Sequence, residues 1–201
     1  MKRLSIILLI VFASIQAKSQ DESSTFDFKF FPSIHFGFFN PSDVNTYIEN
    51  DLSAYSIEFG TTDLVMNFNI GLGASLRFFE LFEIQPVFEY SIAPKIISGA
   101  DKSYSFTKMS GGVIANLLIP LSDSKKHSII IGAGMLFNQI NFEDFSGSSF
   151  NPRFQAGMSL NNKKFNPQLI IAYDMAKAND SEIKYFELDY SSVRIGVNLN
   201  L

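Results

Sequence analysis

The chain has 201 residues, of which 46% are hydrophobic and 18% are charged, and its net charge is −4 at pH 7. This acidic balance argues against nucleic acid as a partner, because nucleic-acid-binding proteins carry basic patches. The lack of cysteine excludes disulfide bonds and a lipid anchor on cysteine. The 22 Phe residues would need a large dry core in a water-soluble domain, whereas in a lipid bilayer they can face outward.

Residues 1–20 have the layout of a secretory signal peptide. Lys2 and Arg3 form a basic start, residues 4–13 form an apolar run, and a small and polar stretch follows. The run is too short for a spanning helix, and no later segment has eighteen consecutive apolar residues. We predict cleavage after Ala17 or Gln20 and a single mature domain, 21–201. That domain carries 13 basic and 20 acidic side chains.

The mature chain contains repeated two-residue alternation. In residues 66–78 every even position is apolar and every odd position is small or polar. Successive side chains of a strand point to opposite faces, so this segment has one apolar and one polar face. Its length exceeds the 9–11 residues or so that a tilted strand needs to cross a bilayer. The alternation predicts eight strands, at 26–38, 66–78, 82–92, 106–119, 128–140, 150–160, 165–175 and 188–201.

The connecting segments alternate in length. Segments 79–81, 120–127 and 161–164 are short, whereas segments 40–65, 93–105, 141–149 and 176–187 are longer on average. Short turns at one rim and long loops at the other are typical of bacterial outer-membrane barrels. In the longest loop, 41–62, Ser42 followed by apolar Val44, Tyr47 and Ile48 fits the cap of a short amphipathic helix.

Four prolines fall inside or near the ends of the predicted strands. Proline removes a hydrogen bond from the ladder, and a closed barrel has no edge strand on which that loss is harmless. A bulge, a strand end or a shift in register is therefore expected at Pro32, Pro86, Pro152 and Pro167.

The polar face separates a membrane barrel from a secreted β-sandwich or lipocalin-like barrel with an apolar interior. A soluble outer face would be rich in Lys, Glu and Thr, but here the polar face consists mainly of Gly, Asn, Ser and Gln. Such residues suit the narrow lumen of an eight-stranded barrel. We therefore predict an all-β, antiparallel, up-and-down transmembrane barrel, monomeric and in contact with outer-membrane lipid.

Single charges on the polar face require partners in the lumen, because a buried unpaired ion is costly. The sequence predicts a lumen charge network that pairs Arg77 with Glu83 across the turn 79–81, Arg153 with Asp174 on adjacent strands, and Glu89 with Lys108 or Arg194 across the lumen.

The leader, the eight segments and the last strand together resemble the small eight-stranded outer-membrane β-barrels of Gram-negative bacteria. Residues 38–45 resemble the first loop of a broad group of barrels whose relatives include the small barrel component of the type IX secretion system. The last strand resembles the family's C-terminal insertion signal, which implies recognition by the barrel assembly machinery. The family usually ends on Phe, and this chain ends on Leu. The apolar residues of the signal are Val193, Ile195, Val197, Leu199 and Leu201.

No catalytic, cofactor or metal site is predicted. Barrel lipid A deacylases carry a His and a Ser two residues apart on a lipid-facing strand. Here His35 is followed two residues later by Gly37 and is expected to point inward, and His127 directly precedes Ser128. Metal-ligand spacing is absent. Eight strands also leave a lumen filled by side chains, so no open diffusion channel is expected.

The sequence therefore favours a non-enzymatic outer-membrane protein with an envelope-structural, adhesive or loop-mediated binding role. Two alternatives stay open. One is a component of a secretion or assembly machinery that binds a protein partner through the loop 41–62. The other is a lipid-modifying barrel enzyme, which the shortage of suitable histidines disfavours.

Overall fold

The computed structural model describes residues 26–40, 42–43, 46, 65–79, 81–97, 103–121, 127–142, 145–160, 166–180 and 187–201. The predicted leader 1–20 and most of the predicted loop 41–62 lie outside this part of the chain. Within it, no helix is long and apolar enough to cross a membrane.

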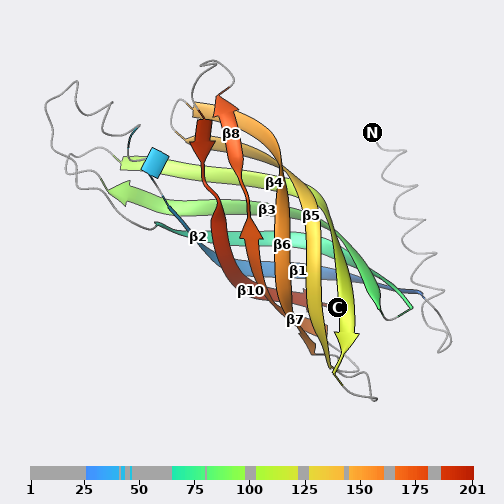
Figure 1. The fold of residues 1–201 in the computed structure, drawn as a ribbon. Coiled ribbons are helices and arrows are strands. Elements are labelled where there is room, and N and C mark those ends of the chain that lie inside the picture. Colours follow the sequence, from blue (N-terminus) through green and yellow to red (C-terminus); the bar gives the residue numbers. More distant parts are fainter. Residues whose placement is uncertain are drawn as a thin grey trace, which may run out of the picture.

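The described strands form one antiparallel sheet that closes on itself (Figure 1). Closure comes from two pairings, β1 with β10 and β5 with β6. The strands are β1 (Phe26–Phe39), β2 (Val65–Phe78), β3 (Phe82–Ile97), β4 (Ser103–Pro120), β5 (His127–Phe142), β6 (Phe145–Leu160), β7 (Asn166–Asp174), β8 (Lys177–Asp180), β9 (Glu187–Asp189) and β10 (Ser192–Asn200).

Four of these segments make up two barrel strands. β7 and β8 pair with β6 in one continuous register, and β10 and β9 likewise face β7 and β8 in one register. Two hydrogen bonds bridge the breaks, from the Met175 N–H to the Pro152 oxygen at 3.1 Å and from the Tyr190 N–H to the Ala176 oxygen at 2.9 Å. The fold is therefore the closed eight-stranded antiparallel barrel that the alternation predicted.

Each of the four prolines lies at an interruption of one ladder. The β1–β10 pairing stops at Ser33, next to Pro32, and the β2–β3 pairing has a gap opposite Pro86. The β6–β7 pairing begins just after Pro152 and stops just before Pro167. Since proline has no N–H to donate, the missing pairs lie where the ladder would need that donor.

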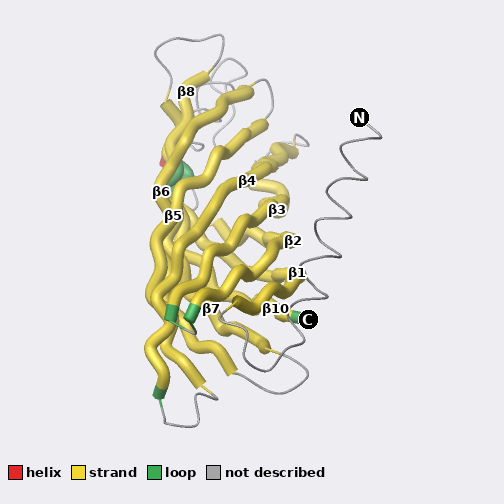
Figure 2. Tube along the Cα trace, turned by 90° about the vertical axis from the view of Figure 1, so that its right-hand side faces the viewer, coloured by secondary structure: helices red, strands yellow, loops and turns green. Residues whose placement is uncertain are grey.

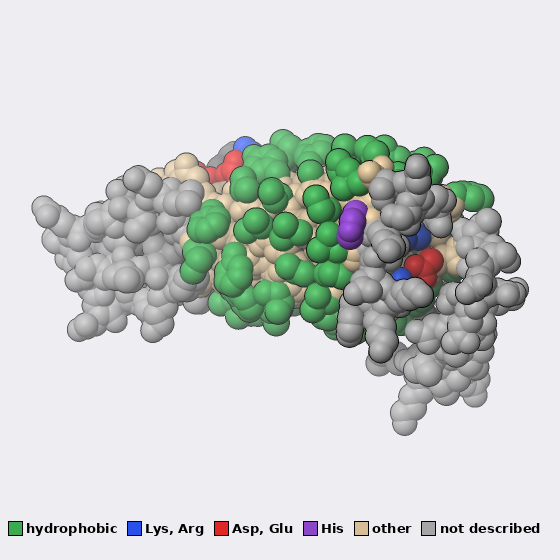
Figure 3. All heavy atoms as spheres, turned by 90° about the horizontal axis from the view of Figure 1, so that it is seen from below, with side chains coloured by type: hydrophobic (Ala, Val, Ile, Leu, Met, Phe, Trp, Pro, Cys, Tyr) green, Lys and Arg blue, Asp and Glu red, His purple; other side chains and the backbone are tan. Residues whose placement is uncertain are grey.

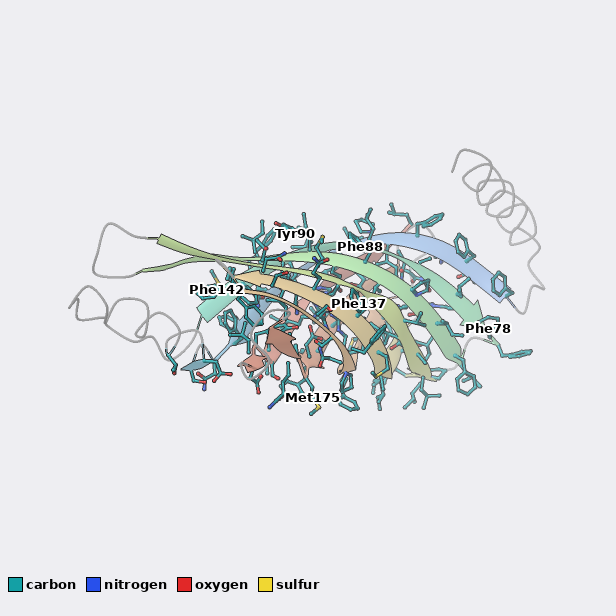
Figure 4. The ribbon with its side chains drawn as sticks, turned by 90° about the horizontal axis from the view of Figure 1, so that it is seen from above. Phe78, Phe88, Tyr90, Phe137, Phe142 and Met175 are labelled. Carbon is teal, nitrogen blue, oxygen red and sulfur yellow. The ribbon has the colours of Figure 1, made fainter. Side chains whose placement is uncertain are left out.

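The outer surface of the barrel is apolar. Hydrophobic side chains cover the middle of the visible face, and charged ones lie toward its ends (Figure 3). Figure 4 shows Phe88 and Met175 projecting away from the barrel on different sides. Such a belt suits lipid, because patches of this extent are rare on soluble monomers. Exposed apolar side chains occur on every barrel strand and include Phe36, Ile70, Phe88, Val113, Met135, Phe154, Ile171 and Ile195.

The prediction of a longer loop at 141–149 was wrong. β5 continues to Phe142 and β6 begins at Phe145, and these two residues pair directly. β3 and β4 also extend further, to Ile97 and from Ser103, into the predicted loop 93–105. Elongated strands thus replace part of the predicted loops at this end of the barrel, where β8 also stands (Figure 2).

The cause is a reversal of the two faces. In the middle of β5 the outward Met135 and Phe137 are apolar and exposed. Beyond them the inward Ile140 and Phe142 are apolar and buried, and the outward Asn141 is polar. A strand that leaves the bilayer meets water outside, so the lipid-facing pattern ends although the strand does not.

The membrane placement of the barrel wall can be tested at Met135, in the middle of β5. Met135→Arg is expected to destabilise the barrel by about 2–4 kcal/mol, the cost of an arginine facing lipid near the bilayer midplane. Met135→Leu, which keeps the apolar contact, is the matched control and should be nearly neutral. Urea unfolding in phospholipid vesicles measures both, and a neutral arginine variant would contradict a lipid-facing position.

Candidate functional site

The end of the lumen next to the turn between β2 and β3 holds a hydrogen-bonded set that we call the Glu83 network. Glu83 is fully buried, and its carboxylate accepts hydrogen bonds from donors on four strands. The Arg77 guanidinium donates at 2.7 Å and the Ser75 hydroxyl at 2.9 Å, both from β2. The amides of Gln85, Asn116 and Gln168 complete the set. The network therefore joins β2, β3 and β4 to β7 across the lumen.

Further along the lumen lies a second group, the charge cluster, formed by Glu89, Lys108, Arg153, Asp174 and Arg194. All five side chains are at most 4% exposed. Arg153 and Arg194 each bind both carboxylate oxygens of Glu89, at 2.7–3.0 Å. Arg153 also donates to Asp174, at 2.5 Å from Nε. Lys108 Nζ lies 3.3 Å from Asp174.

The two alternatives for Glu89 are thereby separated. Arg194 on β10 binds Glu89 on β3, whereas Lys108 forms an ion pair with Asp174. Arg77 lies opposite Glu83, and Arg153 lies opposite Asp174, in the registers of their strands. The structure therefore brings all seven residues of the proposed lumen network into two groups.

The loop-side end of the lumen is closed by an aromatic plug that was not foreseen from the sequence. Phe106 packs against Phe39 and Tyr190, with ring centroids 5.3 and 5.7 Å apart. Lys108 of the charge cluster lies 5.4 Å from the centre of the Tyr190 ring. The buried residues of the plug are Phe39, Ala93, Phe106, Ile140, Phe142, Phe145, Ala176, Ala178, Leu188 and Tyr190.

Two smaller apolar clusters also line the interior. One contains Phe31, Val87, Ile114 and Leu136, and the other contains Leu118, Ile130, Ile170 and Ala172. These residues occupy the polar phase of their strands, so an alternation rule that assigns one phase to water and the other to lipid misses them. The sequence did contain a signal for these clusters, because apolar residues stand at inward-facing positions such as Phe31, Ile114 and Leu136.

Neither histidine forms the lipid-facing His–Ser pair that a barrel deacylase uses. His35 is buried in the wall beside β10, where it pairs with Gly196, and His127 is exposed at the short-turn end of β5. Across the described residues, no group of three or more His, Asp or Glu side chains could hold a metal ion. The buried carboxylates are instead saturated by donors of the barrel itself.

A polar pocket opens outward at the loop-side rim among the described residues, and we call it the rim pocket. Its volume is about 560 Å³. Asp43 accepts a hydrogen bond from the Asp189 N–H at 2.8 Å, which ties the start of the first loop to β9. Lys177 lies 3.5 Å from Asp189. The pocket is lined by Asn40, Ser42, Asp43, Tyr173, Lys177, Asp189 and Ser191.

The start of the first loop is helical where the structure describes it, at Ser42, Asp43 and Thr46. The Thr46 hydroxyl donates to the Ser42 carbonyl at 3.0 Å. The capping residue is Asn40 rather than Ser42, because the Asn40 side-chain oxygen accepts the Ser42 N–H at 3.0 Å. This cap places Asp43 over the rim pocket.

No protein-family model matches the chain, and no curated protein matches it. Among solved structures, Neisserial surface protein A matches with a TM-score of 0.54 and 11% identity over 89% of this chain and 97% of its own. The attachment invasion locus protein Ail of Yersinia pestis, in complex with the heparin analogue sucrose octasulfate, matches with a TM-score of 0.44 and 12% identity, covering 87% and 99%. The likeness to the Neisserial protein supports the small outer-membrane barrel fold.

The charge cluster should behave as one energetic unit. Arg153→Met is expected to cost about 3–5 kcal/mol, because it leaves two buried carboxylates short of a partner. Adding Asp174→Asn should recover part of that loss, with a coupling of about 1 kcal/mol or more. The exposed pair offers a control, since Lys177→Met should cost no more than about 1 kcal/mol. Additive effects in urea unfolding would contradict a coupled cluster.

The filled lumen predicts an absence of channel activity. Purified protein in planar bilayers should give no stepwise ion conductance, because the Glu83 network, the charge cluster and the plug occupy successive parts of the lumen. A sixteen- to eighteen-stranded porin, which has a water-filled lumen, is the positive control. Reproducible conductance steps from folded, monomeric protein would show that the interior opens.

Proposed function

We propose that this small outer-membrane β-barrel is a non-enzymatic, monomeric binding protein that holds a polar partner at its loop-side rim. The barrel serves as the anchor, and the residues above the bilayer make the contact. The observation that carries the proposal is the rim pocket, a polar hollow that stands above a lumen filled with side chains.

Three features of the molecule support a binding role over transport or catalysis. The interior charges are paired with one another at 2.5–3.3 Å, and the aromatic plug lies between them and the loop side. Ser33 shares the buried, inward face of β1 with His35, so that pair lies in the lumen and not on the lipid-facing side, and Ser128 directly follows His127 on the opposite face of β5. The rim pocket, in contrast, offers carboxylate, amide, hydroxyl and ammonium groups toward the outside.

The rim pocket also has a rigid base. The Asp189 carboxylate forms an ion pair with Lys177 and accepts a hydrogen bond from the Ser191 N–H at 2.9 Å. The Asp189 N–H in turn donates to the Asp43 carboxylate. The Ser191 hydroxyl accepts the Ala176 N–H at 3.0 Å. Since a preorganised site loses less entropy on binding, this bonded frame favours recognition of a polar partner.

The proposal also covers how the barrel is inserted into the outer membrane. The last strand presents Val193, Ile195, Leu199 and Leu201 on the outside, where they are exposed. We propose that this apolar row is the insertion signal read by the barrel assembly machinery. A secretion or assembly role would use the same rim, because the loop 41–62 begins at the rim pocket.

Photo-crosslinking in intact cells tests the binding role. A photoreactive residue in place of Ser191, in the rim pocket, should give a discrete adduct with a partner. The same residue in place of Leu121, beside a short turn at the opposite end, should not. Asp43→Ala should weaken the Ser191 adduct because it removes the tie between the first loop and β9.

The matched control for that variant is Asp27→Ala, an exposed aspartate at the other end of the barrel that should leave the adduct unchanged. Heat-modifiable gel migration confirms that each variant is folded. Equal adduct yields from positions 191 and 121 would overturn the proposal. An adduct yield at position 191 that does not change with Asp43→Ala would overturn it as well.

A further inference from the structure

The barrel wall carries an apolar groove at the junction of β1, β2 and β3 with the end of the chain. Its volume is about 620 Å³. Every side chain that lines it is apolar or absent. The lining residues are Phe30, Phe31, Pro32, Leu72, Gly73, Ala74, Pro86, Val87, Phe88 and Leu201.

The groove exists because the sheet is interrupted there. Pro86 has no N–H, and the β2–β3 pairing is missing between the Gly73–Val87 and Leu76–Ile84 pairs. On the other side of β1, the β1–β10 pairing stops next to Pro32, and beyond it the Leu201 N–H donates to the Phe30 oxygen at 2.9 Å. Two neighbouring ladders are therefore weakened at one level of the wall.

The inner apolar cluster forms the floor of the groove. Gly73 has no side chain, and the ring of Phe31 occupies the space where a Cβ atom of residue 73 would stand. Phe31 and Val87 belong to the inner apolar cluster with Ile114 and Leu136, yet both also line the groove. The groove therefore reaches from the outer surface to the apolar interior without meeting a polar group.

The surroundings of the groove identify its occupant. Leu72, Phe88 and Leu201 on its borders are 67%, 58% and 61% exposed, and they belong to the lipid-facing belt. A hollow that is continuous with this belt lies in hydrocarbon, where an empty space would lose dispersion contacts on every lining atom. The groove lies in the half of the barrel that bears the short turns, which face the periplasm in this type of barrel.

We propose that the groove binds one acyl chain of a phospholipid from the periplasmic leaflet, held more tightly than the lipids that surround the rest of the barrel. The chain would cover the interruption of the β2–β3 ladder and pack on Phe31 and Val87. This lipid site lies in the bilayer-facing wall and is independent of the rim pocket.

Native mass spectrometry of the detergent-extracted protein tests the site directly. The wild-type barrel should keep one phospholipid after delipidation has removed the others. Ala74→Leu, which fills the groove from β2, should lower the lipid-bound fraction about tenfold, as expected when two buried methylene contacts are lost. Ala133→Leu, at an exposed alanine on the outer face of β5, is the matched control and should keep the lipid.

A fluorescence measurement keeps the test valid if Ala74→Leu folds poorly. The chain has no Trp, so Phe88→Trp places a single reporter at the groove and Phe154→Trp places one on the plain wall of β6. In vesicles, brominated phospholipid quenches Trp fluorescence when it touches the ring. A retained lipid exchanges slowly for brominated lipid, so the Trp at position 88 should be quenched later than the Trp at position 154. Equal quenching at both positions, together with a graded spread of lipid adducts in the mass spectra, would overturn the proposal.

Discussion

The structure depends on one constraint, namely that backbone N–H and C=O groups inside a bilayer find no water and must bond to each other. Closure of the sheet between β1 and β10 and between β5 and β6 meets it. Closure then dictates two opposite environments for alternate residues, lipid outside and a narrow lumen inside. The prolines are tolerated because each interrupts one ladder locally. The register resumes beyond Pro86 between β2 and β3, and beyond Pro152 between β6 and β8.

The narrow lumen explains the density of its polar bonding. A side chain that points inward cannot reach bulk water, so each charge needs a partner from another strand. Glu83 and Glu89, six residues apart on β3, each collect donors from several strands and connect opposite walls. These bonds connect strands across the lumen, and together with the aromatic plug they fill the described interior with side chains. The two sites that we propose, the rim pocket and the apolar groove, therefore both lie at the surface of the barrel.

Most of the architecture could be predicted because the period-two pattern is enforced by lipid wherever a strand lies within the bilayer. Met66 to Phe78 keep that pattern, and their strand was predicted almost to the residue. The failures occur where the environment changes. At Ile140, Phe142 and Phe145 the inner face becomes apolar and the outer face polar, so the pattern indicated a loop although the strands continue.

The sequence by itself determined the barrel, the facing of its residues and the pairing of Arg77 with Glu83, because a short turn fixes the register of the strands that flank it. Only the tertiary structure decided that Arg194 rather than Lys108 binds Glu89, that Asp43 bonds to β9, and that Pro32, Gly73 and Pro86 meet at one groove. The first two contacts join segments that are far apart in the chain, and the groove forms where the breaks of the β1–β10 and β2–β3 ladders coincide. Their distances depend on how the sheet tilts and closes, which no local pattern encodes.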